Sequence, residues 1–333
     1  MIARLMCFGM ALVAFPVLAQ TPVRFSIDWS FQGYHGGFVQ AADLGFYQKQ
    51  GLAVTMERGF GVTDTIAKVA SGTYDIGFAD INALVEFNAL HPDNRVIGVF
   101  QIYDRTMAAI MALRKSGIRA PSDLVGRSIA GAQADVARLL FPAFAKANNI
   151  DPAKVKWNIY APNLRDSMVV QGRDDAVSGY TITSIFNLVG AGVPQDQIVT
   201  LSYADLGVDV YGSSLLVRQG WAGEHADTIR KFIVATMQGL NSAITDRPSA
   251  IADVVKRDRL LDPVVERARL DMVIDTAFVT PFIKAHGWGT LDPARVQATI
   301  DLNAAAYGLA TPPTQAELVS TDYLPDASSR RLP

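Results

Sequence analysis

The sequence predicts an α/β protein of two lobes that are joined by two crossing strands. Residues 25–54 read as a strand, a glycine-rich loop, a helix and a second strand, and the same alternation continues along the chain in two blocks. The 333 residues are also enough for two separate hydrophobic cores. Two connections between two lobes permit hinge closure over a cleft, and ligands of open α/β sheets bind where strand ends face helix starts.

The first 19 residues have the pattern of a cleavable secretory signal. Arg4 precedes an apolar run over 10–18, and Val17-Leu18-Ala19 stands before Gln20. The single cysteine, Cys7, lies inside this segment and ahead of most of the apolar run. We therefore expect a soluble, secreted protein without a thiol, a disulfide or a lipid anchor.

The charge balance gives no reason to expect nucleic acid or an anionic membrane as a partner. The chain has 30 Lys and Arg residues against 32 Asp and Glu residues, and its formal net charge is −2 at pH 7. After the first 19 residues, no segment approaches the ~20 apolar residues that are needed to span a bilayer. These observations favour a small-molecule ligand.

The first block opens with the glycine-rich loop and a helix that Gly51 ends. Asp80 stands in N-cap position before an apolar run, and the spacing of apolar residues assigns the other elements. The predicted elements are a helix over 63–71, a strand over 75–79, a helix over 80–89, and strands over 96–102 and 108–114.

Pro121 and the polar residues 122–127 mark a crossing into the second block. The predicted elements there are strands over 128–132, 155–160, 176–179 and 198–202, and helices over 135–147, from about 163, and over 181–189. A strand over 214–217 leads back to the first lobe.

From Glu224 onward the chain is predicted to be almost entirely helical, with prolines near the helix starts. The expected helices are 224–245, 248–257, 262–285 and 292–306. The predicted boundaries place the signal at 1–19, the first lobe at 20–113 and 215–319, the second lobe at 114–214, and a loosely held tail at 320–333.

Several motifs together resemble a known family. They are Asp28-Trp29 followed after five residues by His35-Gly36-Gly37, Leu44-Gly45-Phe46-Tyr47, Gly72-x-Tyr74-Asp75-Ile76-Gly77, and Asp175-Ala176-Val177-x-Gly179-Tyr180. With the secretory signal, this set resembles the substrate-binding proteins of bacterial ABC importers. The most similar branch includes the binders of thiamine pyrimidine precursors, nitrate, sulfonates and taurine.

The resemblance implies a type II periplasmic-binding-protein fold, with a mixed sheet flanked by helices in each lobe. It also implies a periplasmic monomer that captures a ligand between its lobes and delivers it to an inner-membrane permease. The sequence departs from the pyrimidine-precursor branch after Tyr180, because small hydroxyl residues over 181–184 stand where the family often has an acidic residue. A flat heterocycle, a sulfonate and an aromatic carboxylate therefore all stay open as ligands.

Trp29 and Tyr180 are the first candidates for ligand contact. Both stand at predicted strand ends, in opposite lobes, so closure would place a flat ligand between their rings. Alternatively, each ring packs in the core of its own lobe. His35 and Gly36 lie in the glycine-rich loop, where either a ligand contact or a structural role fits.

Three aspartates stand at predicted strand-to-helix junctions: Asp28, Asp80 and Asp135. All three are candidate ligand contacts, but an aspartate at such a position also caps the helix and stabilises it by ~0.5–2 kcal/mol. Capping is the favoured role for Asp80 and Asp135. Asp28 is the better candidate for a hydrogen bond to a ligand N–H or ammonium group.

A second loop, Gly59-Phe60-Gly61, precedes a helix and is predicted to expose backbone amides to an anion or a carbonyl oxygen. It lacks the lysine-containing phosphate-loop pattern. Gln133, Asn163 and Arg165 are expected to complete the site from the second lobe. Arg105 and Arg165 are the expected partners of an anionic ligand.

An enzyme and a sensor are the alternatives to a transport protein. No G-x-S-x-G motif occurs, and histidines 35, 91, 225 and 286 have no metal-ligand spacing. Enzymes that share the implied fold rely on cysteines, which the exported chain lacks. We therefore expect neither catalysis nor a cofactor, whereas a receptor that reads the closed form stays open.

Overall fold

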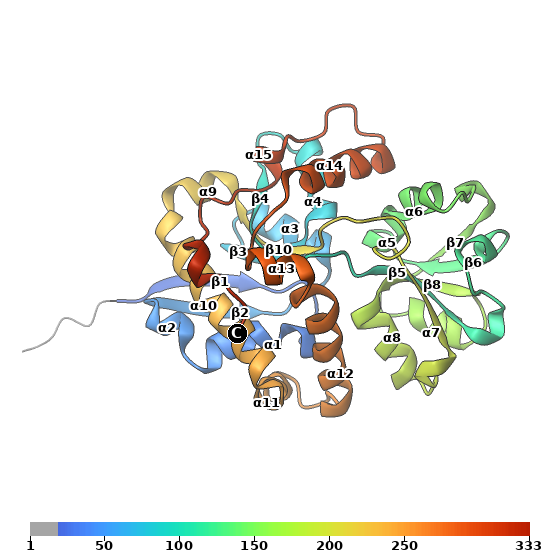
Figure 1. Ribbon diagram of the computed structural model, residues 1–333, viewed down its shortest axis with the longest axis horizontal. Coiled ribbons are helices and arrows are strands. Elements are labelled where there is room, and N and C mark those ends of the chain that lie inside the picture. Colours follow the sequence, from blue (N-terminus) through green and yellow to red (C-terminus); the bar gives the residue numbers. More distant parts are fainter. Residues whose placement is uncertain (1–18) are drawn as a thin grey trace, which may run out of the picture.

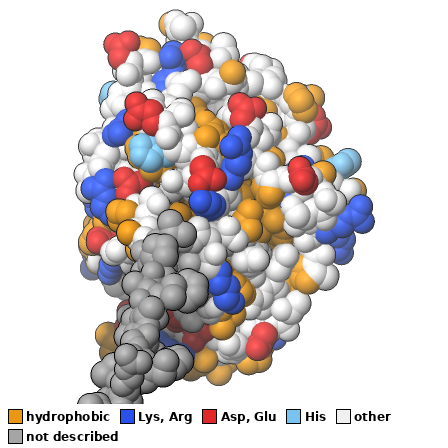
Figure 2. Space-filling view, turned by 90° about the vertical axis from the view of Figure 1, so that its left-hand side faces the viewer, with side chains coloured by type: hydrophobic (Ala, Val, Ile, Leu, Met, Phe, Trp, Pro, Cys, Tyr) orange, Lys and Arg blue, Asp and Glu red, His pale blue; other side chains and the backbone are white. Residues whose placement is uncertain are grey.

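The computed structural model describes residues 19–333 of the chain. Figure 1 shows two lobes side by side, each built on one sheet with helices packed around it. The predicted secretory signal falls almost wholly outside the described residues. On the face of the first lobe in Figure 2, acidic and basic side chains are intermixed, in keeping with the small net charge.

The first sheet has the strand order β2–β1–β3–β10–β4. These strands are β1 (Thr21–Ser26), β2 (Leu52–Glu57), β3 (Ile76–Asp80), β4 (Val96–Gln101) and β10 (Ser213–Arg218). Strand β1 pairs parallel with β2 and β3, whereas β10 pairs antiparallel with β3 and β4. The loops that follow β1, β2 and β3 therefore share one edge of this sheet.

The second sheet has the order β7–β6–β8–β5–β9. Its strands are β5 (Ala108–Leu113), β6 (Ser128–Gly131), β7 (Lys156–Ile159), β8 (Ala176–Tyr180) and β9 (Ile198–Ser202). Strand β6 pairs parallel with β7 and β8, and β5 pairs antiparallel with β8 and β9. The predicted fold class, α/β with a mixed sheet in each of two lobes, is confirmed.

Helices pack around both sheets (Figure 1). Those of the first lobe are α1 (Gly36–Asp43), α2 (Phe46–Lys49), α3 (Val62–Ala70), α4 (Ile81–Leu90), α9 (Gln219–Glu224), α10 (Ala226–Thr245), α11 (Arg247–Arg257), α12 (Pro263–Val273), α13 (Pro281–His286), α14 (Pro293–Tyr307) and α15 (Gln315–Leu318). Those of the second lobe are α5 (Val136–Leu139), α6 (Phe141–Ala147), α7 (Arg165–Val170) and α8 (Thr181–Gly190).

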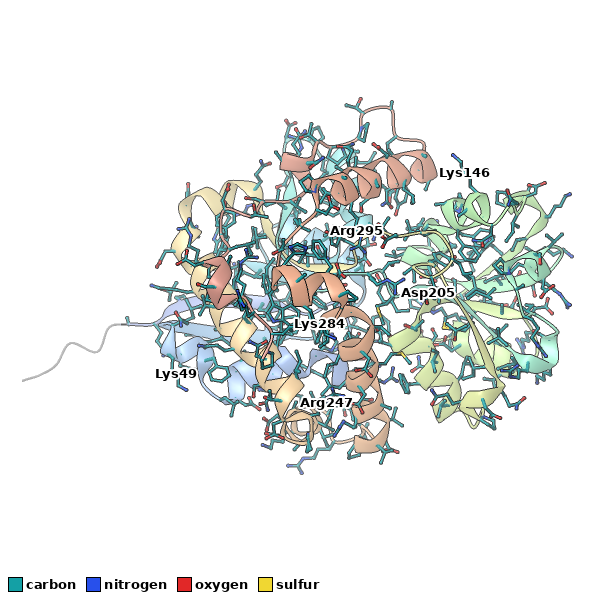
Figure 3. All side chains as sticks on the ribbon, viewed as in Figure 1. Lys49, Lys146, Asp205, Arg247, Lys284 and Arg295 are labelled. Atoms are coloured by element: carbon teal, nitrogen blue, oxygen red, sulfur yellow. The ribbon has the colours of Figure 1, made fainter. Side chains whose placement is uncertain are left out.

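The chain crosses between the lobes at residues 102–107 and 203–212. The two crossing segments are hydrogen-bonded to each other, with Thr106 N donating to Val210 O at 2.9 Å and Gly212 N to Tyr103 O at 3.1 Å. Figure 3 labels Asp205, which belongs to the second segment, and Arg295, which pairs with Asp104 of the first segment at 2.9 Å. The predicted departure from the first lobe at residue 113 is wrong, because β5 pairs with β8 and β9 of the second sheet.

Two long predicted helices are interrupted. The helix over 262–285 gives way to a π-helical turn over Ile274–Phe278 and restarts at Pro281, since proline has no backbone N–H and keeps Thr280 extended. The helix over 135–147 is split at Leu140, just before Pro142. These boundaries were not visible in the spacing of apolar residues alone.

The predicted loosely held tail over 320–333 is held by hydrogen bonds at both ends. Ser320 N donates to Gly98 O at 2.8 Å. Arg330 O accepts from Trp288 N at 2.7 Å, and the Arg330 guanidinium donates to Trp288 O at 2.7 Å. The expectation was wrong because the polar composition of residues 320–333 does not indicate hydrogen bonds to Gly98 and Trp288, which are distant in the sequence.

The core of the first lobe fixes the direction of β1 and of the loop after it. Phe25 is fully buried and lies edge-on to Phe38 and Phe232, with ring centroids 5.2 and 5.1 Å away. Such buried edge-to-face pairs stabilise a strand beyond the area that they bury. The packing of Phe25 therefore fixes the end of β1, and with it the position of residues 27–30 at the edge of the sheet.

Candidate functional site

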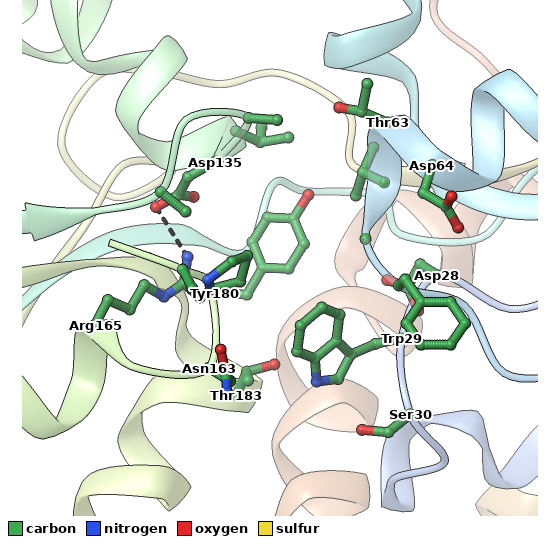
Figure 4. A pocket seen from close by; sticks show the side chains of 18 of the residues that line it. Asp28, Trp29, Ser30, Thr63, Asp64, Asp135, Asn163, Arg165, Tyr180 and Thr183 are labelled. Atoms are coloured by element: carbon green, nitrogen blue, oxygen red, sulfur yellow. Dashed lines mark ion pairs between the residues drawn. The ribbon is translucent and has the colours of Figure 1, made fainter. Parts of the chain in front are cut away.

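A cavity of about 840 Å³ lies between the two lobes (Figure 4). Its first wall comes from the loops after β1 and β2, and its second wall comes from the loops after β6, β7 and β8. A cavity of this size lies within the range of small-molecule sites. The predicted residues that line it are Asp28, Trp29, Phe60, Gly61, Gln133, Asp135, Asn163, Arg165 and Tyr180.

The two aromatic candidates approach the cavity from opposite lobes. Trp29 follows β1 and Tyr180 ends β8, and both side chains are partly exposed (Figure 4). Neither ring is therefore a fully buried core side chain. Their placement on the two walls agrees with the predicted arrangement around a flat ligand, although each wall also contributes polar groups.

His35 lies behind the first wall, set back from the cavity, and its role as a ligand contact stays a prediction. The side chain is fully buried and does not line the cavity. Gln32 N–H donates to His35 Nδ1 at 3.2 Å, so the proton of the neutral ring is on Nε2, which donates to Asp28 Oδ1 at 2.8 Å. The imidazole thus holds the loop that carries Asp28 and Trp29.

Gly36 is also set back from the cavity. It opens helix α1 and is buried, and a Cβ atom there would lie 3.4 Å from the Ala250 methyl group. The predicted ligand contact at Gly36 stays a prediction. Helix α1 packs against α11 behind the site, and an added Cβ at Gly36 would meet α11 at an ordinary contact distance.

Asp80 caps helix α4, as favoured from the sequence, and it does not line the cavity; its role as a ligand contact stays a prediction. Its carboxylate accepts from Asn82 N at 2.8 Å and from the Tyr180 hydroxyl at 2.8 Å. Burial raises the pKa of Asp80, while the hydrogen bonds from Asn82 and Tyr180 offset part of that effect. Asp80 thereby connects the first lobe to an aromatic residue of the second wall.

The amides of the second loop are already engaged, contrary to the prediction of free donors. Gly59 N donates to Trp29 O at 3.0 Å, and Gly61 N donates to Asp28 O at 2.9 Å. A Cβ atom at Gly59 would lie 2.1 Å from Ile27 O, so only glycine allows this approach. The two loops of the first wall are therefore joined through their backbones.

Phe60 projects from that second loop and is 62% exposed. The Arg58 guanidinium lies 4.8 Å and the Lys68 ammonium 5.0 Å from the centre of its ring. Both cations are within the distance at which an aromatic face attracts them. Phe60 therefore offers an accessible apolar surface at the cavity, with its ring orientation favoured by two cations.

The second wall is built around an ion pair between Asp135 and Arg165. Asp135 caps helix α5 by accepting from Ala137 N at 3.0 Å. The same carboxylate forms an ion pair with the Arg165 guanidinium, with 3.0 Å between Arg165 Nη1 and Asp135 Oδ2, and accepts a hydrogen bond from the Ser178 hydroxyl at 2.5 Å. Arg165, expected to meet an anionic ligand, is thus already paired with a carboxylate.

The other predicted residues of the second lobe differ in their placement. Gln133 and Asn163 are exposed at the cavity, where their amides can reach a ligand. Arg105 does not line the cavity: it lies in the first crossing segment and pairs with Asp205 at 2.7 Å. The structure therefore places Arg105 away from the cavity, and an anion contact there stays a prediction.

Several lining residues were not predicted: Ser30, Gln32, Tyr34, Arg58, Thr63, Asp64, Tyr160, Thr183, Asn187 and Asp258. Thr183 and Asn187 stand one helical turn apart after Tyr180, and this spacing was a usable signal. Asp258 follows α11, far along the sequence, and no pattern pointed to it. Among residues 19–333, no group of three or more His, Cys, Asp or Glu side chains is arranged to hold a metal ion.

Residues 32–250, more than half of the chain, match the family described as NMT1/THI5 like. The chain belongs to the NMT1/THI5-like family. This family membership confirms the resemblance that the motifs predicted. Helix α12 and everything after it lie beyond the matched residues.

Two curated relatives align with part of the chain. A formylaminopyrimidine-binding protein from Halalkalibacterium halodurans is 26% identical over 194 residues, which are 54% of this chain and 58% of that protein. A 4-amino-5-hydroxymethyl-2-methylpyrimidine phosphate synthase from Legionella pneumophila is 24% identical over 147 residues, which are 44% of this chain and 45% of that protein. The chain thus spans about half the length of the curated relatives it matches.

A solved structure matches nearly the whole fold. The alkanesulfonate-binding protein SsuA from Xanthomonas axonopodis pv. citri, bound to MOPS, superposes with a TM-score of 0.69 at 16% identity. The match covers 90% of this chain and 98% of that protein. The chain therefore has the fold of a periplasmic substrate-binding protein. Within the described residues, no helix is long and apolar enough to cross a membrane.

Proposed function

We propose that this protein is the solute-binding component of an ABC import system and that it captures a small, flat, polar heterocycle between its lobes. The observation that carries the proposal is the cavity that Trp29 and Tyr180 approach from opposite walls. Aromatic faces bind flat rings, and the amides of Gln133 and Asn163 can pair with heteroatoms at the ring edge.

The charges around the cavity favour a neutral heterocycle over an anion. Arg165 is paired with Asp135, Arg58 lies over the Phe60 ring, and the Gly61 amide is bonded to Asp28 O. A sulfonate or aromatic carboxylate would have to compete with these partners. Anion binding in the same transport role is therefore the second candidate, supported by the fold shared with a sulfonate-binding protein.

An enzyme is the other alternative, because one relative is named a pyrimidine phosphate synthase. The chain has no cysteine after Cys7, and Asp135 and Arg165 at the cavity are paired with each other. We therefore propose binding and delivery without chemistry on the ligand. In this role the protein is a periplasmic monomer, and its closed form engages a membrane permease or, alternatively, a sensor.

A ligand screen tests the proposal. Native mass spectrometry of the protein, purified without refolding, would detect a retained ligand. Thermal unfolding is then measured with pyrimidines, flavin-like heterocycles, sulfonates and aromatic carboxylates. A ligand at ~100 times its Kd stabilises the folded protein by ~2.7 kcal/mol. A heterocycle hit supports the proposal, a sulfonate or carboxylate hit replaces it with the anion alternative, and turnover of a bound pyrimidine would establish an enzyme.

A further inference from the structure

Helix α12 contacts both walls of the cavity from behind, although it lies outside the residues that match the family. In Figure 1 it stands between the first sheet and helix α8 of the second lobe. On the first-wall side, Gly33 N donates to Glu266 Oε2 at 2.5 Å. A Cβ atom at Gly33 would lie 1.8 Å from Glu266 O, so the loop of Trp29 rests directly on the α12 backbone.

On the second-wall side, Arg269 extends from the same helix to α8. Its guanidinium donates to Ile182 O at 2.5 Å, to Thr183 O at 3.2 Å and to the Asn187 side-chain oxygen at 3.0 Å. It also lies 5.3 Å from the centre of the Phe186 ring. All of these partners belong to one helix of the opposite lobe, and Thr183 and Asn187 line the cavity.

Glu266 and Arg269 are themselves an ion pair. Arg269 Nε donates to Glu266 Oε1 at 3.2 Å, and the Arg269 side chain is 5% exposed and the Glu266 side chain 3% exposed. Burial raises the pKa of Glu266 and lowers that of Arg269, in line with two charges that have lost water. A buried guanidinium with five donors depends on its acceptors, and α8 supplies three of them.

We propose that Glu266 and Arg269 form an interlobe clasp that positions the two ligand-bearing walls relative to each other. Glu266 holds the Trp29 loop, and Arg269 holds the first turns of α8. The two residues act as positioning residues and touch no ligand, since neither lines the cavity. The clasp rests on the proposed binding function for its purpose, but its effect on the lobe arrangement exists without any ligand.

The test measures the distance between the lobes in the full, ligand-free chain. Spin labels are attached at Ala252→Cys on α11 and Arg173→Cys after α7, both exposed positions, in a Cys7→Ser background. Distance distributions are compared for the parent and for Arg269→Gln. Hydrogen bonds to a charged group each shift an equilibrium by about tenfold or more. In Arg269→Gln, we expect the ratio of molecules with the parent's interlobe distance to molecules with a longer distance to fall by at least about tenfold.

Arg267 provides the matched control. It lies two residues earlier on α12, its side chain is 41% exposed, and it pairs with Asp271 of the same helix. Arg267→Gln should leave the distance distribution unchanged. Arg269→Lys is measured as well, since it keeps the charge beside Glu266 but cannot reach the α8 acceptors together, so it should also open the lobes.

An unchanged distribution in folded Arg269→Gln or Arg269→Lys would overturn the clasp, as would an equal opening in Arg267→Gln. Circular dichroism melting identifies variants that have unfolded. The ligand screen decides the proposed function separately. If the lobes open on mutation but the protein binds none of the screened compounds, the clasp is upheld and the proposed function is rejected. If the lobes do not open but the protein binds a heterocycle, the proposed function is upheld and the clasp is rejected.

Discussion

The two walls of the cavity are built in different ways. The first wall consists of two loops joined through their backbones, and it presents the apolar faces of Trp29 and Phe60. The second wall presents the amides and hydroxyls of Gln133, Asn163 and Thr183 around a buried ion pair. Each wall thus carries one of the two proposed stacking rings, Trp29 or Tyr180, but the first wall adds the exposed Phe60 ring, whereas the second adds amides and a hydroxyl around its ion pair.

The difference also extends to how each wall is held rigid. Backbone hydrogen bonds and glycines fix the first wall, so its geometry tolerates little added volume. Side-chain bonds centred on Asp135 fix the second wall, so changes of charge there alter selectivity more than shape. The following variants test this contrast, from the largest expected effect to the smallest.

Gly59→Ala should have the largest effect. The added methyl would lie 2.1 Å from Ile27 O and 2.8 Å from Asp28 O, which are backbone atoms and cannot move aside alone. We expect a loss of at least about 1–3 kcal/mol of unfolding free energy together with loss of ligand binding. Gly190→Ala, at the end of α8 with nothing near its added methyl, is the control and should be nearly neutral. Denaturant unfolding measures the stability of both variants. Equal stabilities would contradict the close backbone approach that requires glycine at position 59.

Trp29→Ala should weaken binding of a flat heterocycle by about 1–3 kcal/mol, as stacking on an aromatic side chain does elsewhere. Because Trp29 is only partly buried, the loss of stability should stay below about 2 kcal/mol. Trp288→Ala is the contrasting variant, since Trp288 is fully buried and should cost ~3–5 kcal/mol of stability. Calorimetric titration and thermal melting measure both quantities. Unchanged affinity in Trp29→Ala would remove Trp29 from the site.

Asp135→Asn should free Arg165 on the second wall. Asparagine can still cap α5, but the guanidinium loses its carboxylate partner. We expect affinity for methanesulfonate to rise by up to about tenfold, because a charge-assisted bond becomes available to an anion. Asp175→Asn breaks a longer and more exposed pair with Arg127, away from the cavity, and serves as the control for removing a carboxylate beside an arginine. An equal response of the two variants to methanesulfonate would show that Arg165 does not govern anion binding.

The sequence predicted the fold class, the succession of strands along the chain and some of the loop residues that line the cavity, because these follow from apolar spacing and glycine-rich loops. It could not tell that His35 and Asp80 face buried partners, because a polar residue at a strand end has the same sequence pattern whether it faces a ligand or a buried side chain. It also assigned β5 to the first lobe, since spacing identifies a strand but not its sheet. The role of α12 depends on contacts across the whole chain and left no local pattern.

The smallest effect concerns the hydrogen bond that the Tyr180 hydroxyl of the second wall donates to Asp80 of the first lobe. The pKa of Asp80 is raised above the ordinary value of 3.8, mainly by burial, with Asp28 adding to the rise and Asn82 and Tyr180 opposing it. A carboxyl group with a raised folded-state pKa stabilises the fold below the unfolded pKa, and this contribution is lost as pH rises through the folded value.

Asp80→Asn keeps an oxygen that can cap α4, and its amide nitrogen can donate to the Tyr180 hydroxyl oxygen in place of the present bond, but it cannot titrate. The unfolding free energy of the variant should therefore rise relative to that of the parent as pH increases from below 3.8 toward neutrality. Denaturant unfolding at a series of pH values measures this difference. A constant difference across the series would mean that the Asp80 carboxylate is as well solvated in the fold as in the unfolded chain, and that its bond to Tyr180 joins the walls at no electrostatic cost.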